Sequence, residues 1–288
     1  MRTLIEAIDQ RVLLTDGSLA RQLRGAQLNV ARDLNGVEDC LELLNLTRAQ
    51  LVRESHRAYL RAGADVIRTN SLQASPLSLA RWDLADQAFY LNYAAAELAC
   101  EAVDSVPGRG RRRFVLGVVR DQGWDAAPAE LEAAVAVQVE GLLAGGVDGV
   151  AIDMVPGTGR APAFLRGARR AKQKLKALAP VFLQRGHQGV EFSEHALGLA
   201  DGLIRSRHGG AEAKTGKRDW LKAALEEEVN LIGGGDSPAA TAKLDRALRA
   251  ISDDGWRPFT GWRRPAVVDE VTPPSSSLHL DPAMAEVA

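Results

Sequence analysis

Cysteine is scarce in this sequence, which contains only Cys40 and Cys100. A secreted disulfide scaffold carries more cysteines, and a thiolate metal site spaces them more closely. Both residues lie in apolar or helical stretches, which indicates buried and unreactive thiols. The segment from Met1 to Gln10 lacks the apolar core of a signal peptide. We therefore expect the protein to be cytoplasmic.

Long apolar runs and an excess of charge of one sign are also missing. No stretch approaches the ~20 apolar residues that span a bilayer, so we expect no membrane partner. The formal net charge is −1, so no overall field attracts nucleic acid. Hydrophobic residues make up 46% of the chain and charged residues 25%, which is typical of a globular protein with a core of its own. The expected partner is a small-molecule ligand.

Short β-rich runs alternate with longer helical patterns from residue 12 to residue 251, as in a parallel sheet with crossover helices. Seven strands are predicted, at Val12–Thr15, Asp65–Thr69, Phe114–Val119, Gly149–Asp153, Val181–Gln184, Gly202–Ser206 and Val229–Ile232. Helices are predicted near 48–62, 76–104, 128–144, 160–177, 191–199, 213–227 and 238–251. A β/α barrel and a doubly wound open sheet share this alternation, so periodicity alone does not separate them.

The composition changes near residue 253. We predict one barrel domain over residues 1–252 and a tail over residues 253–288 that contains proline and serine clusters. A loosely ordered tail is favoured over a structured module, because the segment has no clear helical period. The alternative is that Trp256, Trp262 and the neighbouring arginines fold back over the barrel or contact a partner.

Three blocks near the N-terminus carry a resemblance to a known family: LLTDGSLARQL at 13–23, LNLTRAQLVRESHRAYLRAGADVIRTNS at 44–71, and LNYAAAELACEA at 91–102. They resemble the homocysteine-binding domain of methionine synthases and betaine–homocysteine methyltransferases. The similarity continues more weakly at 145–154 and 229–238 and covers about residues 10–251. It implies membership of the homocysteine S-methyltransferase family, a transferase activity and a TIM-type parallel β/α barrel.

The resemblance also implies a zinc ion, held by three cysteines at strand ends, that turns homocysteine into a thiolate nucleophile. Here Gly235 and Asp236 match the family's two adjacent cysteines after a double glycine, and Ser206 matches the third. Cys40 and Cys100 fall in segments that the barrel uses for a loop and an outer helix. We therefore expect the zinc site to be lost and no zinc to be held as a cofactor.

Other family positions are partly kept. Asp16-Gly17 matches the Asp-Gly that contacts homocysteine in the family, and Asp153 stands where the family uses a glutamate to hold the amino group. In contrast, Arg68 replaces the acid of a Glu-Thr-Asn triplet, and Arg120 replaces the glycine of a Gly-Pro loop. The resemblance thus supports an amino-acid-like ligand in an altered site.

Polar residues at the carboxyl ends of the strands are expected to line the site, as in other barrels. The predicted substrate-binding residues are Asp16, Gly17, Arg68, Asn70, Arg120, Asp153, Arg205 and Arg207, with Arg185 nearby. Guanidinium groups bind carboxylate and phosphate bidentately, so the arginines favour a small anionic ligand. The equally weighted alternative is that they pair with Asp121, Asp153 and Asp201 in structural networks.

A replacement metal site is a weaker hypothesis. His187 and His208, with Asp153 or Asp236, offer nitrogen and oxygen ligands. No two of them lie at the tight spacing of a metal motif, so hydrogen-bonded loop histidines are favoured. No catalytic residue is predicted.

Three functions stay open at this point. The first is an atypical or catalytically silent paralogue that binds a small anionic or amino-acid-like ligand. The second is a divergent methyltransferase or other transferase that acts on another substrate. The third is homocysteine S-methyl transfer through an unrecognised metal site. The first is slightly favoured.

The spacing of the last two strands predicts a barrel that is one β/α unit short. Only residues 209–228 separate them, which fits one helix and no additional strand. A sheet of seven strands must change its tilt and stagger to close. Should it stay open, its edges would need cover. We therefore expect an oligomer, either a homodimer or a complex with a related barrel.

Overall fold

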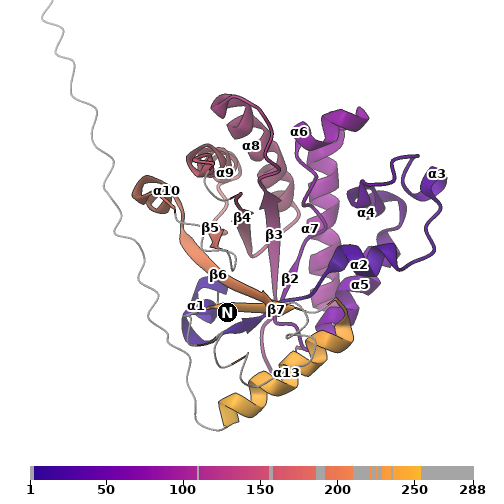
Figure 1. Ribbon diagram of the computed structural model, residues 1–288, viewed down its shortest axis with the longest axis vertical. Helices are drawn as coiled ribbons and strands as arrows, with labels where there is room; N and C mark the ends of the chain where they lie inside the picture. The colour runs from indigo at the N-terminus through magenta and orange to yellow at the C-terminus, as the bar shows by residue number, and fades with distance from the viewer. Residues whose placement is uncertain are drawn as a thin grey trace, which may run out of the picture.

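A TIM-type β/α barrel with seven parallel strands forms the described part of the chain, and helices flank it (Figure 1). The computed structural model describes residues 3–108, 110–155, 158–185, 192–209, 221, 225, 229–234 and 236–253. The strands are β1 (Leu13–Leu14), β2 (Val66–Arg68), β3 (Phe114–Arg120), β4 (Gly149–Asp153), β5 (Val181–Arg185), β6 (Gly202–Gly209) and β7 (Leu231–Gly234). Their order around the sheet is β1-β7-β6-β5-β4-β3-β2.

The two ends of this order meet, so the sheet returns on itself. Thr15 and Val66 form a parallel bridge next to β1 and β2. The Asp65 N–H donates to the Leu14 carbonyl at 2.7 Å, and the Asp16 N–H donates to the Val66 carbonyl at 3.0 Å. These bonds leave the described strands in a nearly closed barrel.

The prediction of seven strands is confirmed for the described residues. Strands β6 and β7 pair directly, from Ser206 opposite Leu231 to Gly209 opposite Gly234, and β7 pairs in turn with β1. No strand therefore lies between β6 and β7 in the sheet that is described. The described sheet has no open edge of the kind expected to need cover, and the oligomer stays a prediction.

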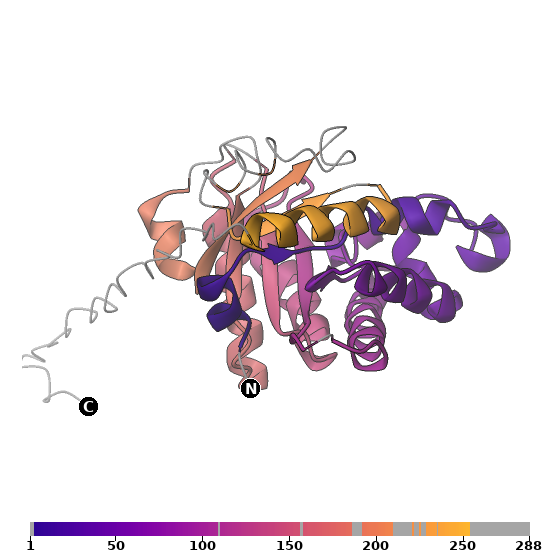
Figure 2. The ribbon, with the colours of Figure 1, turned by 90° about the horizontal axis from the view of Figure 1, so that it is seen from below.

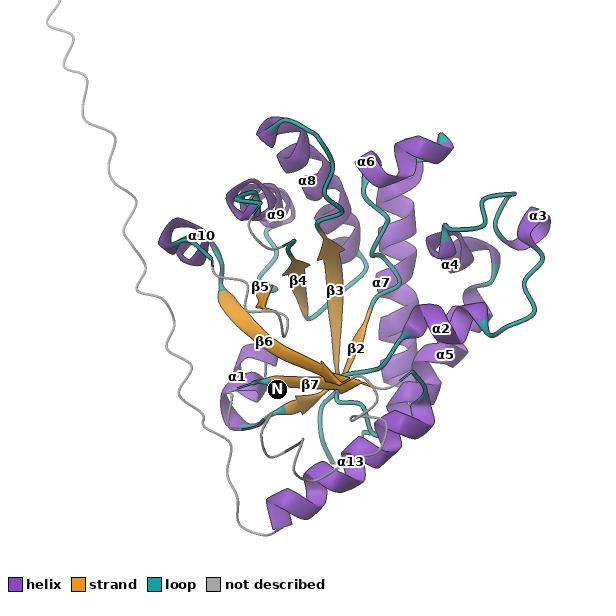
Figure 3. Ribbon diagram, in the orientation of Figure 1, coloured by secondary structure: helices purple, strands orange, loops and turns teal. Residues whose placement is uncertain are grey.

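Helices cover the outer face of the barrel (Figure 3). The main ones are α5 (Ala49–Arg61), α7 (Ala88–Ser105), α8 (Pro128–Ala144), α9 (Ala161–Leu175), α10 (Glu194–Leu199) and α13 (Pro238–Asp253). Figure 2 shows α13 lying across the barrel. Of the helix predicted at 213–227, only Leu221 and Leu225 are described, and both are helical and buried. The predicted tail at 253–288 lies outside the described residues beyond Asp253.

The single helix predicted over 76–104 is wrong, because the segment is broken into four pieces. They are α6 (Pro76–Leu79), η2 (Ala80–Trp82), η3 (Ala85–Gln87) and α7. Asp83 adopts a left-handed backbone with φ of 56° and ends the η2 turn. Short aspartate side chains tolerate this conformation better than most residues do, which explains where the break falls.

Several short helices precede β2 that the sequence patterns did not predict. They are α1 (Leu4–Gln10), α2 (Leu19–Arg24), α3 (Val30–Asp33), η1 (Leu41–Leu43) and α4 (Leu44–Thr47). Helix α1 begins with a capping box between Thr3 and Glu6, a signal that was readable in the sequence. The others are six residues or fewer, too short for hydrophobic periodicity to show.

Helix α1 seals one end of the barrel. Its Leu4, Ala7 and Ile8 join a core cluster with side chains from every strand, among them Phe114 and Phe182. The barrel interior is therefore filled at this end, as the taper of a small barrel requires. The alternate residues of β3 to β5 pack outward against the flanking helices in a second, larger cluster.

We expect Leu4→Ala to lower the free energy of unfolding by about 2–5 kcal/mol, since it leaves a cavity in a closed core. Leu4 is 2% exposed. Gln10→Ala on the exposed side of the same helix is the control, and we expect a change within about 0.5 kcal/mol. Urea denaturation of the two variants measures both values. Equal losses of unfolding free energy in the two variants would show that the packing of α1 into the end of the barrel does not stabilise the fold.

Candidate functional site

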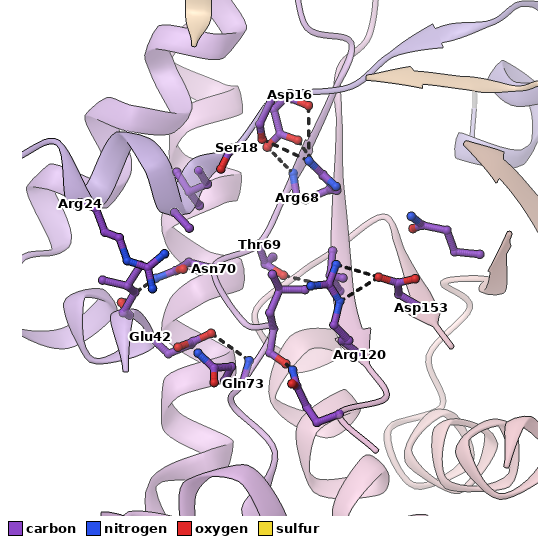
Figure 4. Close-up of a pocket in the computed structure, with 18 of the residues that line it drawn as sticks. Asp16, Ser18, Arg24, Glu42, Arg68, Thr69, Asn70, Gln73, Arg120 and Asp153 are labelled. Atoms are coloured by element: carbon purple, nitrogen blue, oxygen red, sulfur yellow. Dashed lines mark hydrogen bonds and ion pairs between the residues drawn. The ribbon is translucent and has the colours of Figure 1, made fainter. Parts of the chain in front are cut away.

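A cavity of about 500 Å³ opens at the carboxyl ends of the strands (Figure 4). The loop after β1 supplies Asp16, Gly17 and Ser18, α2 supplies Leu19, Ala20 and Arg24, and η1 supplies Leu41 and Glu42. The segment after β2 contributes Thr69, Asn70, Leu72 and Gln73, and the remaining strand ends contribute Arg68, Val118, Arg120, Gln122, Asp153, Gln184 and Asp236. A cavity of this size and polarity is typical of a small-molecule site.

Asp16 and Arg68 form a buried ion pair at one edge of the cavity (Figure 4). The Arg68 Nε donates to Asp16 Oδ1 at 2.8 Å, and the Arg68 backbone N–H donates to Oδ2 at 3.0 Å. The guanidinium also donates to the Gly17 carbonyl at 3.1 Å. The Asp16 side chain is 1% exposed and that of Arg68 is 24% exposed. Arg68 thus hydrogen-bonds both Asp16 and Gly17, the two residues that the family resemblance predicts to contact the ligand.

Arg120 and Asp153 form a second pair that faces the cavity. Both Nε and Nη2 of Arg120 lie within 2.9 Å of Asp153 Oδ2. Their side chains are 45% and 24% exposed, so a ligand reaches both. The predicted alternative of an arginine paired with Asp153 therefore occurs at Arg120, while Arg68 pairs with Asp16, which that alternative did not include. Each arginine charge is balanced by a carboxylate.

The other two aspartates of that alternative have different partners. Buried Asp121 pairs with Arg160 at 2.9 Å. Asp201 pairs with Lys172 at 2.6 Å and accepts a bond from the Val181 N–H at 2.8 Å. These contacts anchor loops at strand ends.

Asn70 serves mainly to hold the loops around the cavity together. Its side-chain amide donates to the Leu41 carbonyl at 2.9 Å and to Asn45 Oδ1 at 3.0 Å. Asn45 in turn donates to the Asn70 carbonyl at 2.9 Å. Asn70 therefore ties the end of β2 to η1, which places Glu42 in the cavity wall.

Glu42 is a cavity residue that sequence analysis missed. It is 3% exposed, and its Oε1 accepts a bond from the Gln73 N–H at 2.8 Å. Burial raises the pKa of this carboxyl, against the opposing effect of the Gln73 bond. The only available signal was an acid among apolar residues in the sequence CLELL.

His56 of α5 lies close enough to Asp16 for the carboxylate charge to affect its pKa. It is fully buried, and neither ring nitrogen has a hydrogen-bond partner among the described residues. Burial lowers the pKa of His56 to about 4, although the Asp16 charge acts in the opposite direction. The imidazole is therefore neutral at physiological pH.

Ser206 and Asp236 are held by neighbours other than a metal. Gln184 Nε2 donates to Ser206 Oγ at 3.2 Å. Asp236 forms an ion pair with Arg21, and its carbonyl accepts a bond from Gln22 Nε2 at 3.2 Å. Gly235 lies outside the described residues. Within those that are described, no three His, Cys, Asp or Glu side chains gather as metal ligands would.

The two cysteines lie apart from Ser206 and from each other. Cys40 is buried at the start of η1, and Cys100 lies half-buried on α7 beside a second cavity. Burial raises the pKa of each thiol to about 12, and nearby carboxylates add to the shift. Both are therefore protonated thiols, as the sequence indicated.

Of the remaining predicted residues, only Arg205 has a described side chain, and it lies away from the cavity. Arg205 follows Ile204, which faces the barrel interior, so strand alternation places the Arg205 side chain on the outer face. It does not line the cavity. The side chains of Arg185, Arg207 and His208 lie outside the described residues, as does His187.

None of the helices in the described ranges is long and apolar enough to cross a membrane.

Sequence comparison matches residues 13–202 to the family model described as Homocysteine S-methyltransferase. The methionine synthases of Mycobacterium tuberculosis and Mycobacterium leprae are both 31% identical to this chain, in alignments of 196 and 197 positions that cover 62% of it. The aligned region is 15% of the length of each relative. The chain thus matches one part of much longer proteins.

Solved structures show the same fold. The homocysteine methyltransferase MmuM from Escherichia coli, in its metallated form, aligns with a TM-score of 0.61 at 24% identity, over 82% of this chain and 96% of that protein. Its oxidized form aligns with a TM-score of 0.62 over 85% and 98%.

Proposed function

Because the chain belongs to the homocysteine S-methyltransferase family, we propose that it is an atypical or catalytically silent member that binds an amino-acid-like ligand in the mouth of the barrel. In this proposal the zinc-thiolate site of the family is degenerate. The observation that carries it is the set of contacts made by Ser206 and Asp236, which match two of the three cysteine positions.

The residues at these positions do not fit a thiolate-bound zinc. A serine hydroxyl stays protonated at neutral pH and is a poor substitute for a cysteine ligand. The Ser206 hydroxyl already accepts a bond from Gln184, and the Asp236 carboxylate already pairs with Arg21. Neither Cys40 nor Cys100 lies at a strand end. These residues therefore give no basis for a reaction step through zinc.

The charges around the cavity favour an amino-acid-like ligand over a simple anion. Its described wall holds three arginines and four carboxylic acids. Arg68 is neutralised by buried Asp16, which leaves no unbalanced positive charge there. The Arg120–Asp153 pair offers a guanidinium for a carboxylate and a carboxylate for an ammonium group, side by side and partly exposed.

Two alternatives have support of their own. A divergent transferase acting on another substrate fits the same cavity, because family membership is compatible with altered chemistry. Homocysteine S-methyl transfer through a different metal would need His187 and His208 as ligands, whose side chains lie outside the described residues. We also propose a cytoplasmic location, and a homodimer or a complex with a related barrel as the partner.

Calorimetric titration with L-norleucine tests the ligand proposal, because norleucine has both charged groups of an amino acid and no thiol. We expect binding to weaken about tenfold or more in Arg120→Ala, through loss of a charge-assisted bond to the carboxylate. Arg166→Ala is the matched control. Arg166 is equally exposed and pairs with Glu132 at 2.9 Å, away from the cavity. Its affinity should equal that of the unmodified protein.

Hexanoate, which lacks the ammonium group, separates the two ligand classes. We expect it to bind more weakly than norleucine and to be insensitive to Asp153→Asn. Equal affinities for hexanoate and norleucine would favour an anion site. No binding of either compound would contradict the proposed ligand.

A further inference from the structure

Glu42 is a buried carboxyl group at the cavity wall that the proposed function does not use. Only 3% of the residue is exposed, although it lines the cavity. One carboxyl oxygen accepts the Gln73 N–H, and the other lies 4.0 Å from the Cys40 sulfur. No arginine, lysine or histidine in the described ranges comes within ion-pair distance of it. A buried carboxylate without a cationic partner is costly.

The charged groups nearest Glu42 do not replace such a partner. Arg81 hydrogen-bonds the Gln73 side chain and stacks its guanidinium on Trp82, 3.8 Å from the ring centroid. Arg24 is exposed on α2 and lies on the same side of the cavity in Figure 4. Both arginines affect the Glu42 carboxyl only through electrostatic attraction, without a direct ion pair. Because Glu42 lines the cavity and pairs with neither arginine, a cation on the ligand can take the place of that partner.

Glu42 and the Arg120–Asp153 pair lie on separate elements on different sides of the cavity (Figure 4). A ligand whose carboxyl group binds Arg120 and whose amino group binds Asp153 directs its side chain into the same cavity. The described wall contains no aromatic residue. It therefore lacks the ring faces that recognise a quaternary ammonium group, and it offers a hydrogen-bond acceptor instead.

We propose that Glu42 binds an N–H-donating cationic group on the ligand side chain, so that the cavity selects an amino acid with a primary ammonium group at its far end. This inference rests on the proposed function, because the α-carboxyl group is taken to bind Arg120 and the α-amino group Asp153. It assigns Glu42 as the specificity-determining residue of the site.

The test compares L-lysine with L-norleucine, which has the same carbon chain without the terminal nitrogen. Calorimetry on the full chain should show lysine binding about tenfold or more tightly, as expected for a hydrogen bond to a charged group. Glu42→Gln should bring the affinities for lysine and norleucine within about twofold of each other. Glu38→Gln, the same change at an exposed position four residues earlier, should preserve the preference. Nε-trimethyl-lysine, which has no N–H donor at the end of its side chain, should bind with little of the preference that lysine shows over norleucine.

A second measurement uses the unmodified protein, in case Glu42→Gln does not fold. Burial raises the pKa of Glu42, and only the ionised carboxylate attracts the ammonium group. The ratio of lysine to norleucine affinity should therefore fall as pH decreases from neutral through that pKa. Norleucine carries the same α-groups, so the effect of pH on their binding cancels from the ratio.

The outcomes distinguish the two proposals. Equal binding of lysine and norleucine, or a preference that survives Glu42→Gln, would overturn the role of Glu42 and leave the amino-acid site intact. Binding of neither compound would overturn both. A preference for trimethyl-lysine over lysine would overturn the requirement for N–H donors.

Discussion

Arg68→Ala is expected to lower the free energy of unfolding by about 3–5 kcal/mol, because it removes the partner of a buried carboxylate. The Asp16 side chain is 1% exposed, and Arg68 donates to it from both Nε and the backbone N–H. The variant keeps the backbone bond and the Thr15 hydroxyl at 3.1 Å, which do not neutralise the charge. Chemical denaturation measures the loss.

Arg120→Ala is the matched control for this effect. Its pair with Asp153 has similar geometry but is much more exposed, and exposed pairs contribute about 0–1 kcal/mol. A double variant, Asp16→Asn with Arg68→Met, should recover part of the stability lost in Arg68→Ala, since no uncompensated charge is left buried. A loss below about 1 kcal/mol in Arg68→Ala would show that the pair is not integral to the barrel.

The strands could be predicted from sequence because they are buried on both faces and punctuated by turns, whereas the barrel itself was implied by the family resemblance. β4 (Gly149–Asp153) agrees with the prediction residue for residue, since a helix end at Gly145-Gly146 precedes it and a charged residue ends it. The count of seven strands followed from the spacing of the last two, because twenty residues do not hold a second helix and strand.

The arrangement of the site was predictable only in part. Strand-end positions identified Asp16, Arg68, Arg120 and Asp153 as cavity residues, but the pairing of their charges depends on which strands become neighbours. Arg120 and Asp153 lie opposite each other in the register of β3 and β4. That register is fixed by the packed barrel and cannot be read along one strand.

Two further differences between the predicted and the observed site also arise from contacts between distant parts of the chain. Arg205 was assigned to the mouth because it ends a strand, yet the inward face of β6 is set by Ile204 in the interior core. Glu42 reaches the cavity because Asn70 and Asn45 tie η1 to the end of β2. Such contacts join residues far apart in the chain, and they cannot be identified from a single sequence.

The largest functional effect expected is the loss of homocysteine methyl transfer. A free thiol has a pKa near ~8.5 and is mostly protonated at neutral pH, whereas metal coordination deprotonates it. A chain that holds no zinc therefore lacks the activated nucleophile. We expect methyl transfer to homocysteine to stay at the background rate across physiological pH.

Restoring the cysteines is the gain-of-function counterpart. Cysteines introduced together at Ser206, Gly235 and Asp236 recreate the three thiolates that the family resemblance implies. We expect this variant to bind about one zinc ion per chain, since three strand-end ligands suffice for a catalytic-type site. Placing three cysteines at exposed helix positions instead gives the control for nonspecific zinc uptake.

Elemental analysis of the unmodified protein, purified from zinc-supplemented medium and dialysed, tests the loss of the zinc site most directly. We expect less than ~0.1 zinc per chain, because Ser206 and Asp236 are engaged by Gln184 and Arg21 and supply no thiolate. About one zinc per chain that survives dialysis would contradict the loss of the site, and would assign metal binding to His187 and His208.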